Sequence, residues 1–450
     1  MHRTSTFTIS MMIVASLMGA VLCQSAFADE SANKARIELA KKFVNQMTRG
    51  EFEKAVKPFD KVMTKALPAE KLKAIWGGLI SQYGPLQQIE KTRTEALKQY
   101  QVVFVTCQFE RGKLDAKLVF TAENTIAGLF FVSTGSYQAP AYVNQAAFTE
   151  VELTIGKGLW SLPGTLSLPQ GEGPFPAVVL VHGSGPHDRD ETIGPNKPFR
   201  DLAQGLASQG IAVLRYEKRT RHHRLKMALF AGGLTVKEET VDDAVAAVET
   251  LTQQPQIDGD RIFVLGHSLG GNLLPRLGVA SDKIAGFISF AGSVRPLEDL
   301  VLEQVKYLLS LDGTITAEEQ QKMDVIIKQV EKVKSPELSE KVAASELPLG
   351  VSAKYWLDLR GYNAAESAKV LKQPLLILQG ERDYQVTLED FGKWKKALGT
   401  RDDVKLISYP KLNHLFMAGE GKSTPAEYTV PGNVAYVVIK DIANWIKAKD

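Results

Sequence analysis

One stretch of nine residues restricts the fold of this chain more than any other. The apolar run IFVL at 262–265 predicts a short buried strand, and it leads directly into GHSLG at 266–270. A Gly-x-Ser-x-Gly turn between a strand and a helix is so sharp that side chains two residues before and after the serine would collide. The pattern therefore predicts that Ser268 is a nucleophile held above the end of a strand.

Two further segments lie downstream in the order that a Ser-Asp-His triad requires. The strand-like run 375–378 ends shortly before Asp383, and the strand-like run 404–409 leads to His414. In such a triad the histidine takes the serine proton, and the carboxylate orients the histidine. The predicted catalytic residues are therefore Ser268 as nucleophile, Asp383 as acid and His414 as base.

An oxyanion hole is predicted from two loops. The buried run 177–181 leads into HGSG at 182–185, where the glycines allow the backbone to approach a ligand closely. We expect the backbone N–H groups of Ser184 and Leu269 to face the oxyanion. Ser184 is also an alternative nucleophile, but nothing in the sequence places a base beside it.

At these motifs the chain resembles the α/β-hydrolase family. The resemblance rests on GHSLGG at 266–271, GERD at 380–383, HGSG at 182–185 and His414, and it covers about residues 147–450. Within the family the chain looks most like bacterial esterases related to dienelactone hydrolases and to the prolyl-oligopeptidase catalytic domain. The resemblance implies an α/β fold with a doubly wound, mostly parallel sheet, and a serine carboxylesterase that forms an acyl-enzyme and needs no cofactor.

The alternation of predicted strands and helices is interrupted within this part of the chain. Strand-like and helical runs alternate, as in a doubly wound α/β sheet, but residues 294–373 contain helical patterns alone. This insertion separates the strands that carry the predicted nucleophile and acid. We predict that it is a helical lid over the active site, and the alternative is a lateral bundle away from the pocket.

The first residues predict export. Residues 1–28 have a positively charged start, an apolar run at 9–22 and an Ala-Phe-Ala sequence at 26–28, as in a cleaved signal peptide. A lipoprotein signal at Cys23 is the alternative. Cleavage after Ala28 predicts a periplasmic or secreted protein without a membrane span, in which Cys107 has no partner for an intrachain disulfide.

A smaller domain is predicted at residues 29–135. Its pattern is helical to about residue 83 and strand-like afterwards, which predicts an α+β domain. This order resembles cystatin-like or NTF2-like modules, whose role here could be dimerisation, binding of a wall component or stabilisation. Residues 136–146 are predicted to be a linker to the hydrolase domain at 147–450.

Composition limits the partners. A chain of 450 residues is too long for one ordinary core, and its net charge of +3 is too small to indicate nucleic acid. No Cys/His cluster has the spacing of a metal site, so neither a metal nor another cofactor is expected. The expected partner is a small-molecule ester, and the oligomeric state stays open.

Several other residues carry weaker predictions. The basic loop 215–226 either steers anionic substrates or is a loop whose Lys218 and Arg219 pair with the acidic run 188–191. His267 is predicted to be a packing residue. His187, His222 and His223 are predicted to face solvent. Tyr355 and Trp356 are predicted to line an acyl pocket.

Two other functions are compatible with the sequence. A serine peptidase of the prolyl-oligopeptidase kind would need a group that holds a peptide amine or a proline ring, and no such group is evident. A non-catalytic binding protein on a hydrolase scaffold is the other alternative. The presence of all three triad residues in order argues against it.

Overall fold

The structure is a computed structural model that describes residues 31–97, 99–110, 112–134, 137–229, 233–311 and 313–449. The predicted signal peptide at 1–28 lies outside these residues. The chain divides into two compact units, one of residues up to 135 with 425–430, and one of residues 136–424 with 431–450. Among the described residues, no helix has the length and apolar character needed to cross a bilayer.

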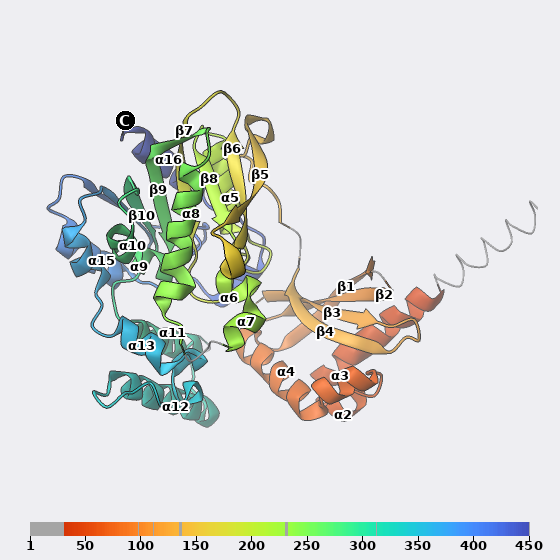
Figure 1. Ribbon diagram of the computed structural model, residues 1–450. Coiled ribbons are helices and arrows are strands. Elements are labelled where there is room, and N and C mark those ends of the chain that lie inside the picture. The colour runs from red at the N-terminus through yellow and green to blue at the C-terminus, as the bar shows by residue number, and fades with distance from the viewer. Residues whose placement is uncertain are drawn as a thin grey trace, which may run out of the picture. The chain divides into compact units, whose positions relative to one another are not determined.

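The smaller unit is an α+β domain, in which helices precede an antiparallel sheet (Figure 1). Alternate side chains of its second strand, such as Val103 and Val105, pack against helical residues such as Phe43 and Trp76. The element order predicted for this domain is therefore confirmed. Its elements are a helix at 31–48, α2 (Phe52–Ala55), α3 (Lys61–Ala66), α4 (Ala69–Tyr83), β1 (Leu86–Leu97), β2 (Tyr100–Phe109), β3 (Gly112–Phe120) and β4 (Ile126–Ser133).

The larger unit is built on an eight-stranded sheet with the order β12-β11-β10-β9-β7-β8-β6-β5. The strands from β12 to β8 are parallel, while β6 is antiparallel to β8 and β5 is antiparallel to β6. The predicted mostly parallel, doubly wound sheet is therefore confirmed. The strands are β5 (Phe148–Ile155), β6 (Leu162–Pro169), β7 (Phe175–Val181), β8 (Ala212–Tyr216), β9 (Ile257–His267), β10 (Gly286–Phe290), β11 (Leu375–Gly380) and β12 (Val404–Tyr409).

Helices cover both faces of this sheet (Figure 1). Val178 and Leu180 of β7 pack with α5 (Pro198–Ala207) and α16 (Tyr436–Lys447), while Val179 and Val181 face the opposite side. Strands that are buried on both faces read as continuous apolar runs, which is why they were predictable. The opposite side is covered by α8 (Asp242–Thr252), α10 (Leu274–Ala280) and α15 (Leu388–Leu398).

The insertion between β10 and β11 is helical, as predicted. Its longest helix, α12, begins with a capping box in which Thr316 and Glu319 bond each other's backbone N–H groups. Figure 1 shows these helices beyond the end of the sheet that carries α9. The insertion contains α11 (Leu297–Leu309), α12 (Ala317–Lys334), α13 (Ala353–Leu359) and α14 (Ala364–Ser367); the short helices elsewhere are α6 (Arg219–His222), α7 (Arg224–Leu229) and α9 (Leu269–Asn272).

Candidate active site

Ser268 lies on a strained turn between β9 and α9. Its φ of 52° and ψ of −113° are uncommon for a residue with a side chain, and its N–H donates to the carbonyl of Phe290 (2.9 Å). A Cβ atom at Gly266 would lie 2.3 Å from the carbonyl carbon of Gly270, and one at Gly270 would lie 2.5 Å from the carbonyl oxygen of Val181. Both glycines of the motif are therefore required for this turn.

Asp383 and His414 form a buried pair. His414 Nδ1 lies 2.6 Å from Asp383 Oδ2, and each side chain is at most 4% exposed. The other carboxylate oxygen, Oδ1, accepts the backbone N–H groups of Gln385 (2.7 Å) and Val386 (3.1 Å). Because Nδ1 donates to the carboxylate, Nε2 is the ring atom left to accept a proton.

The sheet brings the three predicted triad residues to one edge. β9, β10, β11 and β12 are parallel neighbours, so their carboxyl ends, which carry Ser268, Asp383 and His414, lie together. His414 also lies beside His267, the residue before Ser268, because its carbonyl oxygen is 3.2 Å from His267 Nε2 and the two rings are 4.6 Å apart. The three predicted triad residues thus lie at the same edge of the sheet.

A small cavity of about 100 Å³ opens at Ser268. Ser184 and Leu269, whose N–H groups are the predicted oxyanion donors, line it together with Ser268. The insertion therefore lines the cavity at Ser268, which favours the predicted lid over a lateral bundle away from the pocket. Its residues in the lining are Arg295, Pro296, Leu297, Leu300, Val301, Gln304, Leu349, Leu359 and Tyr362.

A second, larger cavity of about 680 Å³ adjoins the first and has a mostly apolar lining. Ser184, Leu297 and Leu349 line both cavities, so the loop at 182–191 and the insertion separate them. Tyr355 lines this cavity, as predicted for an acyl pocket, but Trp356 does not and instead packs inside the insertion. The apolar side chains of the cavity include Pro186, Met227, Leu234, Leu297, Val342, Ala344, Leu349, Val351 and Ala353.

Glu191 and His267 form a buried ion pair that the sequence did not reveal. Glu191 Oε2 lies 2.8 Å from His267 Nδ1, and Glu191 Oε1 accepts the N–H of Gly183 (2.8 Å). Burial raises the pKa of the Glu191 carboxyl, but the facing His267 lowers it further, to about 2. Burial lowers the pKa of His267, and the charge and hydrogen bond of Glu191 reverse this and raise it. Glu191 thus connects the predicted oxyanion loop to the residue that supports His414.

We expect Glu191→Gln to destabilise the protein in a pH-dependent way. The lowered pKa of Glu191 makes its contribution complete above its ordinary value of 4.5 and lost toward pH 2. The raised pKa of His267 makes its contribution complete below its ordinary value of 6.5 and lost at higher pH. The loss of unfolding free energy should therefore be largest near pH 5.5, at about 3 kcal/mol, and smaller at pH 3 and pH 9.

Urea unfolding at these three pH values measures the effect. Glu366→Gln, at an exposed position paired with Lys369, is the matched control and should change stability little at any pH. An equal loss at all three pH values for Glu191→Gln would contradict the ion pair.

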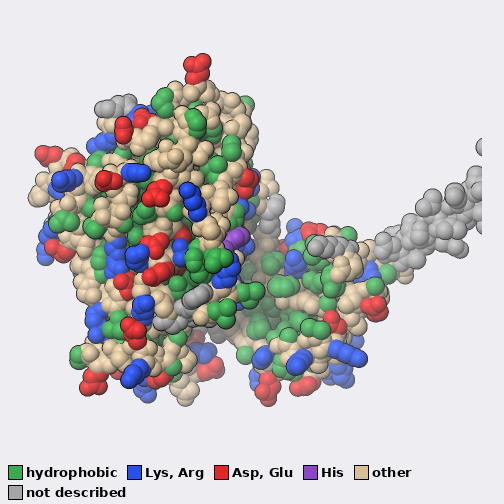
Figure 2. Space-filling view, viewed as in Figure 1, with side chains coloured by type: hydrophobic (Ala, Val, Ile, Leu, Met, Phe, Trp, Pro, Cys, Tyr) green, Lys and Arg blue, Asp and Glu red, His purple; other side chains and the backbone are tan. Residues whose placement is uncertain are grey.

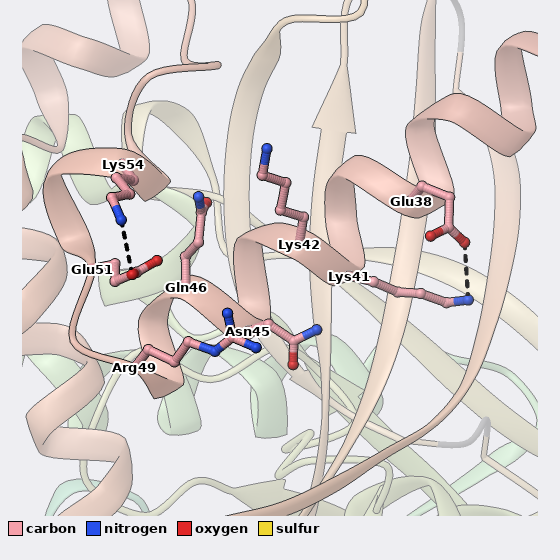
Figure 3. Close-up of a pocket in the computed structure, with 8 residues that line it drawn as sticks. All are labelled: Glu38, Lys41, Lys42, Asn45, Gln46, Arg49, Glu51 and Lys54. Atoms are coloured by element: carbon pink, nitrogen blue, oxygen red, sulfur yellow. Dashed lines mark hydrogen bonds and ion pairs between the residues drawn. The ribbon is translucent and has the colours of Figure 1, made fainter.

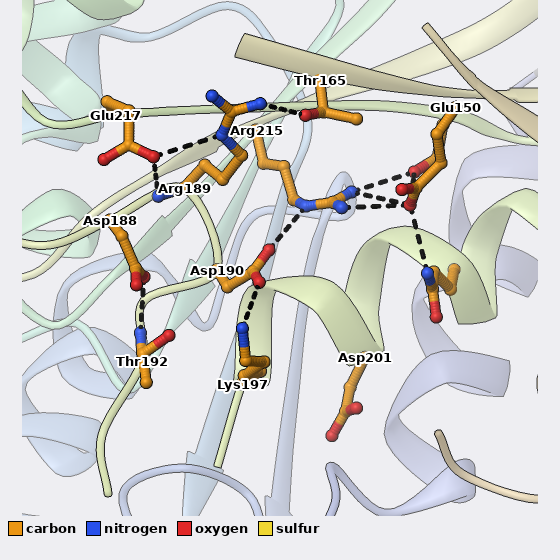
Figure 4. A network of polar contacts seen from close by, with 12 residues as sticks. Glu150, Thr165, Asp188, Arg189, Asp190, Thr192, Lys197, Asp201, Arg215 and Glu217 are labelled. Atoms are coloured by element: carbon orange, nitrogen blue, oxygen red, sulfur yellow. Dashed lines mark hydrogen bonds and ion pairs between the residues drawn. The ribbon is translucent and has the colours of Figure 1, made fainter. Parts of the chain in front are cut away.

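The acidic run 188–191 is held by partners outside itself (Figure 4). Arg189 pairs with Glu217 (3.2 Å), and Asp190 pairs with Arg215 (2.9 Å) and with Lys197 (2.8 Å). These contacts link the loop after β7 to the end of β8. The run is therefore structural, and it fixes the loop that contains Ser184.

The predicted pairing of Lys218 and Arg219 with this acidic run is wrong. Lys218 pairs with Glu239 (3.0 Å) and Arg219 with Asp243 (2.5 Å), so both side chains, which follow the end of β8, contact α8 and the turn before it. Arg221 pairs with Glu217 at 3.4 Å. Figure 2 shows side chains of both charges interspersed over the visible face of the larger unit. Most of the loop's charge is thus neutralised, which weakens the idea of electrostatic steering.

The prediction for the histidines outside the triad is correct only in part. His222 is exposed, but His187 Nε2 bonds the carbonyl of Ser184 (2.7 Å), and His223 Nε2 bonds that of Ser161 (3.0 Å). Two of the three histidines therefore hold loops in place. The sequence does not predict these two contacts, because each partner is a backbone carbonyl whose direction depends on the geometry of its turn.

The smaller unit contains a polar hollow on its first helix and the turn after it (Figure 3). Two exposed ion pairs cross it, Lys41 with Glu38 (3.3 Å) and Lys54 with Glu51 (2.9 Å). Exposed pairs of this kind contribute little to stability, and no Ser, Cys or His side chain is among the residues that line the hollow. Within the described chain, no three His, Cys, Asp or Glu side chains are grouped as metal ligands.

Comparison with known proteins gives matches for both parts of the chain. Residues 173–421 match the family described as "Serine aminopeptidase, S33", and residues 40–129 match a family of unknown function, DUF3887. Esterase EstD from Thermotoga maritima is 40% identical over 406 residues, which are 90% of this chain and 93% of EstD. Esterase FrsA from Klebsiella pneumoniae is 26% identical over 160 residues, 35% of each chain.

Solved structures are more distant. Est1E from Butyrivibrio proteoclasticus superposes with a TM-score of 0.43 and 15% identity, and the match covers 66% of this chain and 98% of Est1E. This likeness is too low to inform on activity.

Proposed function

The chain belongs to the serine aminopeptidase S33 family of hydrolases, and we propose that it is an exported carboxylesterase that works through an acyl-enzyme on Ser268. The observation that carries the proposal is the buried pair of His414 and Asp383 at the sheet edge where the strained Ser268 lies. The esterase names of EstD and FrsA favour an ester as substrate. The sequence at 1–28 supports export.

The proposed reaction has two halves. Ser268 Oγ attacks the ester carbonyl while its proton passes to His414 Nε2, and Asp383 stabilises the imidazolium that forms. The N–H groups of Leu269 and Ser184 stabilise the oxyanion. His414 then gives the proton to the departing alcohol, and water, deprotonated by His414, attacks the acyl-enzyme to release the acid and restore Ser268.

The apolar cavity suggests the kind of ester. It lies next to the site and is large enough for a medium-length alkyl chain or an aromatic ring, and burial of each CH₂ group stabilises binding by about 0.8 kcal/mol. We therefore propose that one half of the substrate is apolar and occupies this cavity. The small cavity at Ser268 is left for the shorter half.

A substrate screen tests the proposed function. Purified mature protein should hydrolyse p-nitrophenyl esters and show little activity on aminoacyl-p-nitroanilides. Preference for the anilides would favour the peptidase named in the family description, and absence of turnover on both would favour a binding protein.

The same screen can test whether the apolar half of the substrate occupies the larger cavity. We expect Leu234→Trp, which narrows the cavity, to raise the KM of long-chain esters roughly tenfold and to spare short-chain esters. Leu225→Trp, at a position that is 86% exposed, is the matched control. The chain length should be varied in the acyl group of p-nitrophenyl esters and in the alcohol of acetate esters. If neither series responds, the cavity is not the substrate site.

A further inference from the structure

The peptide group between Gly183 and Ser184 makes an unusual contact through its oxygen. The Gly183 carbonyl accepts a hydrogen bond from Lys218 Nζ at 2.7 Å. The N–H on the other side of this peptide belongs to Ser184, one of the two proposed oxyanion donors. A peptide group is planar, so fixing the direction of its oxygen also fixes the direction of its N–H.

Lys218 is almost completely buried, with 2% of its side chain exposed. Its ammonium lies 3.0 Å from Glu239 Oε1, and Glu239 Oε2 accepts a hydrogen bond from the Tyr355 hydroxyl (2.8 Å). Its backbone N–H donates to the carbonyl of His187 (3.1 Å). A buried cation is costly unless it is paired and hydrogen-bonded, and this one is held by groups from two other parts of the fold.

Two elements supply these partners. Glu239 lies in a π-helical turn, Lys237–Val241, that precedes α8, and such turns often occur at functional sites. Tyr355 lies on α13 of the insertion, which also lines the apolar cavity. A continuous chain of contacts therefore runs from the insertion through Glu239 and Lys218 to the oxyanion loop.

We propose that Lys218 is a positioning residue that orients and polarises the Ser184 N–H for the oxyanion. A cation at the carbonyl oxygen withdraws electron density through the peptide group, which strengthens the N–H as a donor. Glu239 and Tyr355 hold the ammonium in place. The N–H of Gly183 is held by Glu191 at 2.8 Å, so the loop is fixed on both sides. The inference rests on the proposed function, because it assigns Lys218 a role in the same reaction.

The test compares Lys218→Met with Arg219→Met in the full mature chain. Arg219 is the next residue and is also a buried, ion-paired cation, but it contacts Asp243 and the ring of Trp160, neither of which belongs to the oxyanion loop. Both variants should lose stability. Only Lys218→Met should lower kcat for a p-nitrophenyl ester, by roughly 10- to 100-fold, with KM nearly unchanged.

A transition-state analogue gives a second readout. The Ki of a trifluoromethyl ketone, which forms a tetrahedral adduct with the serine, should rise in Lys218→Met by the same factor as kcat/KM falls. Glu239→Gln, which keeps the size and removes the charge, should show a smaller loss of the same kind. If Lys218→Met does not fold, the kcat of Glu239→Gln tests the positioning role of Lys218 in its place.

Three outcomes are distinguishable. Wild-type kcat in both Lys218→Met and Glu239→Gln, or an equal loss in Arg219→Met, would overturn the positioning role and leave the esterase assignment intact. A rise in KM without a fall in kcat would overturn it too, because it would place Lys218 in substrate binding. Absence of ester hydrolysis in the wild-type protein would instead overturn the proposed function, and the inference with it.

Discussion

Replacing Ser268 by alanine is expected to lower kcat for a p-nitrophenyl ester by roughly 10⁵- to 10⁶-fold, because the covalent step has no other nucleophile. The strained φ of 52° at Ser268 is a property of the backbone, so the alanine variant should keep the same turn. The hydroxyl contributes little packing, so the melting temperature should change by less than about 2 °C.

The measurement is steady-state kinetics on protein whose fold is checked by circular dichroism. Ser184→Ala is the matched control, since Ser184 is proposed to act through its backbone N–H, which alanine retains. This control should keep its kcat within about threefold of the wild-type value. Loss of activity in Ser184→Ala with activity retained in Ser268→Ala would contradict the assignment of the nucleophile.

Asp383→Asn should lower kcat by about 10⁴-fold. Asp383 Oδ1 accepts the N–H groups of Gln385 and Val386, so the amide oxygen of asparagine must occupy that position. The amide NH₂ then faces His414 Nδ1 and can only donate to it. The histidine is thereby held in the tautomer with its proton on Nε2, which cannot accept the proton of Ser268.

The control for this substitution is Asp403→Asn, at a half-exposed aspartate that pairs with Arg401 (2.7 Å) away from the site. Its kcat should equal that of the wild-type protein. Wild-type activity in Asp383→Asn at every pH from 6 to 9 would show that another group orients the base.

The sequence predicted the parts of this structure that depend on local patterns. Buried strands at 262–265 and 375–378 appear as unbroken apolar runs, and the glycines around Ser268 mark a turn that tolerates no Cβ. Because parallel strands end at one edge, the order of the motifs along the chain was enough to bring Ser268, Asp383 and His414 into one site.

The supporting contacts could not be predicted in the same way. Glu191 and His267 are 76 residues apart, Lys218 and Gly183 are 35 apart, and Tyr355 and Glu239 are 116 apart. Which acid meets which base depends on side-chain direction at the ends of β8 and β9, and charge alone does not give that direction. This is why the sequence predicts the wrong carboxylate partners for Lys218 and Arg219.

Covalent labelling shows directly whether Ser268 is the nucleophile. The wild-type protein is treated with a fluorophosphonate, digested, and the modified peptide is identified by tandem mass spectrometry. We expect one adduct per chain, on Ser268, formed in parallel with the loss of esterase activity and absent from Ser268→Ala. An adduct on Ser184 or on any other residue, with Ser268 unmodified while activity is lost, would contradict it.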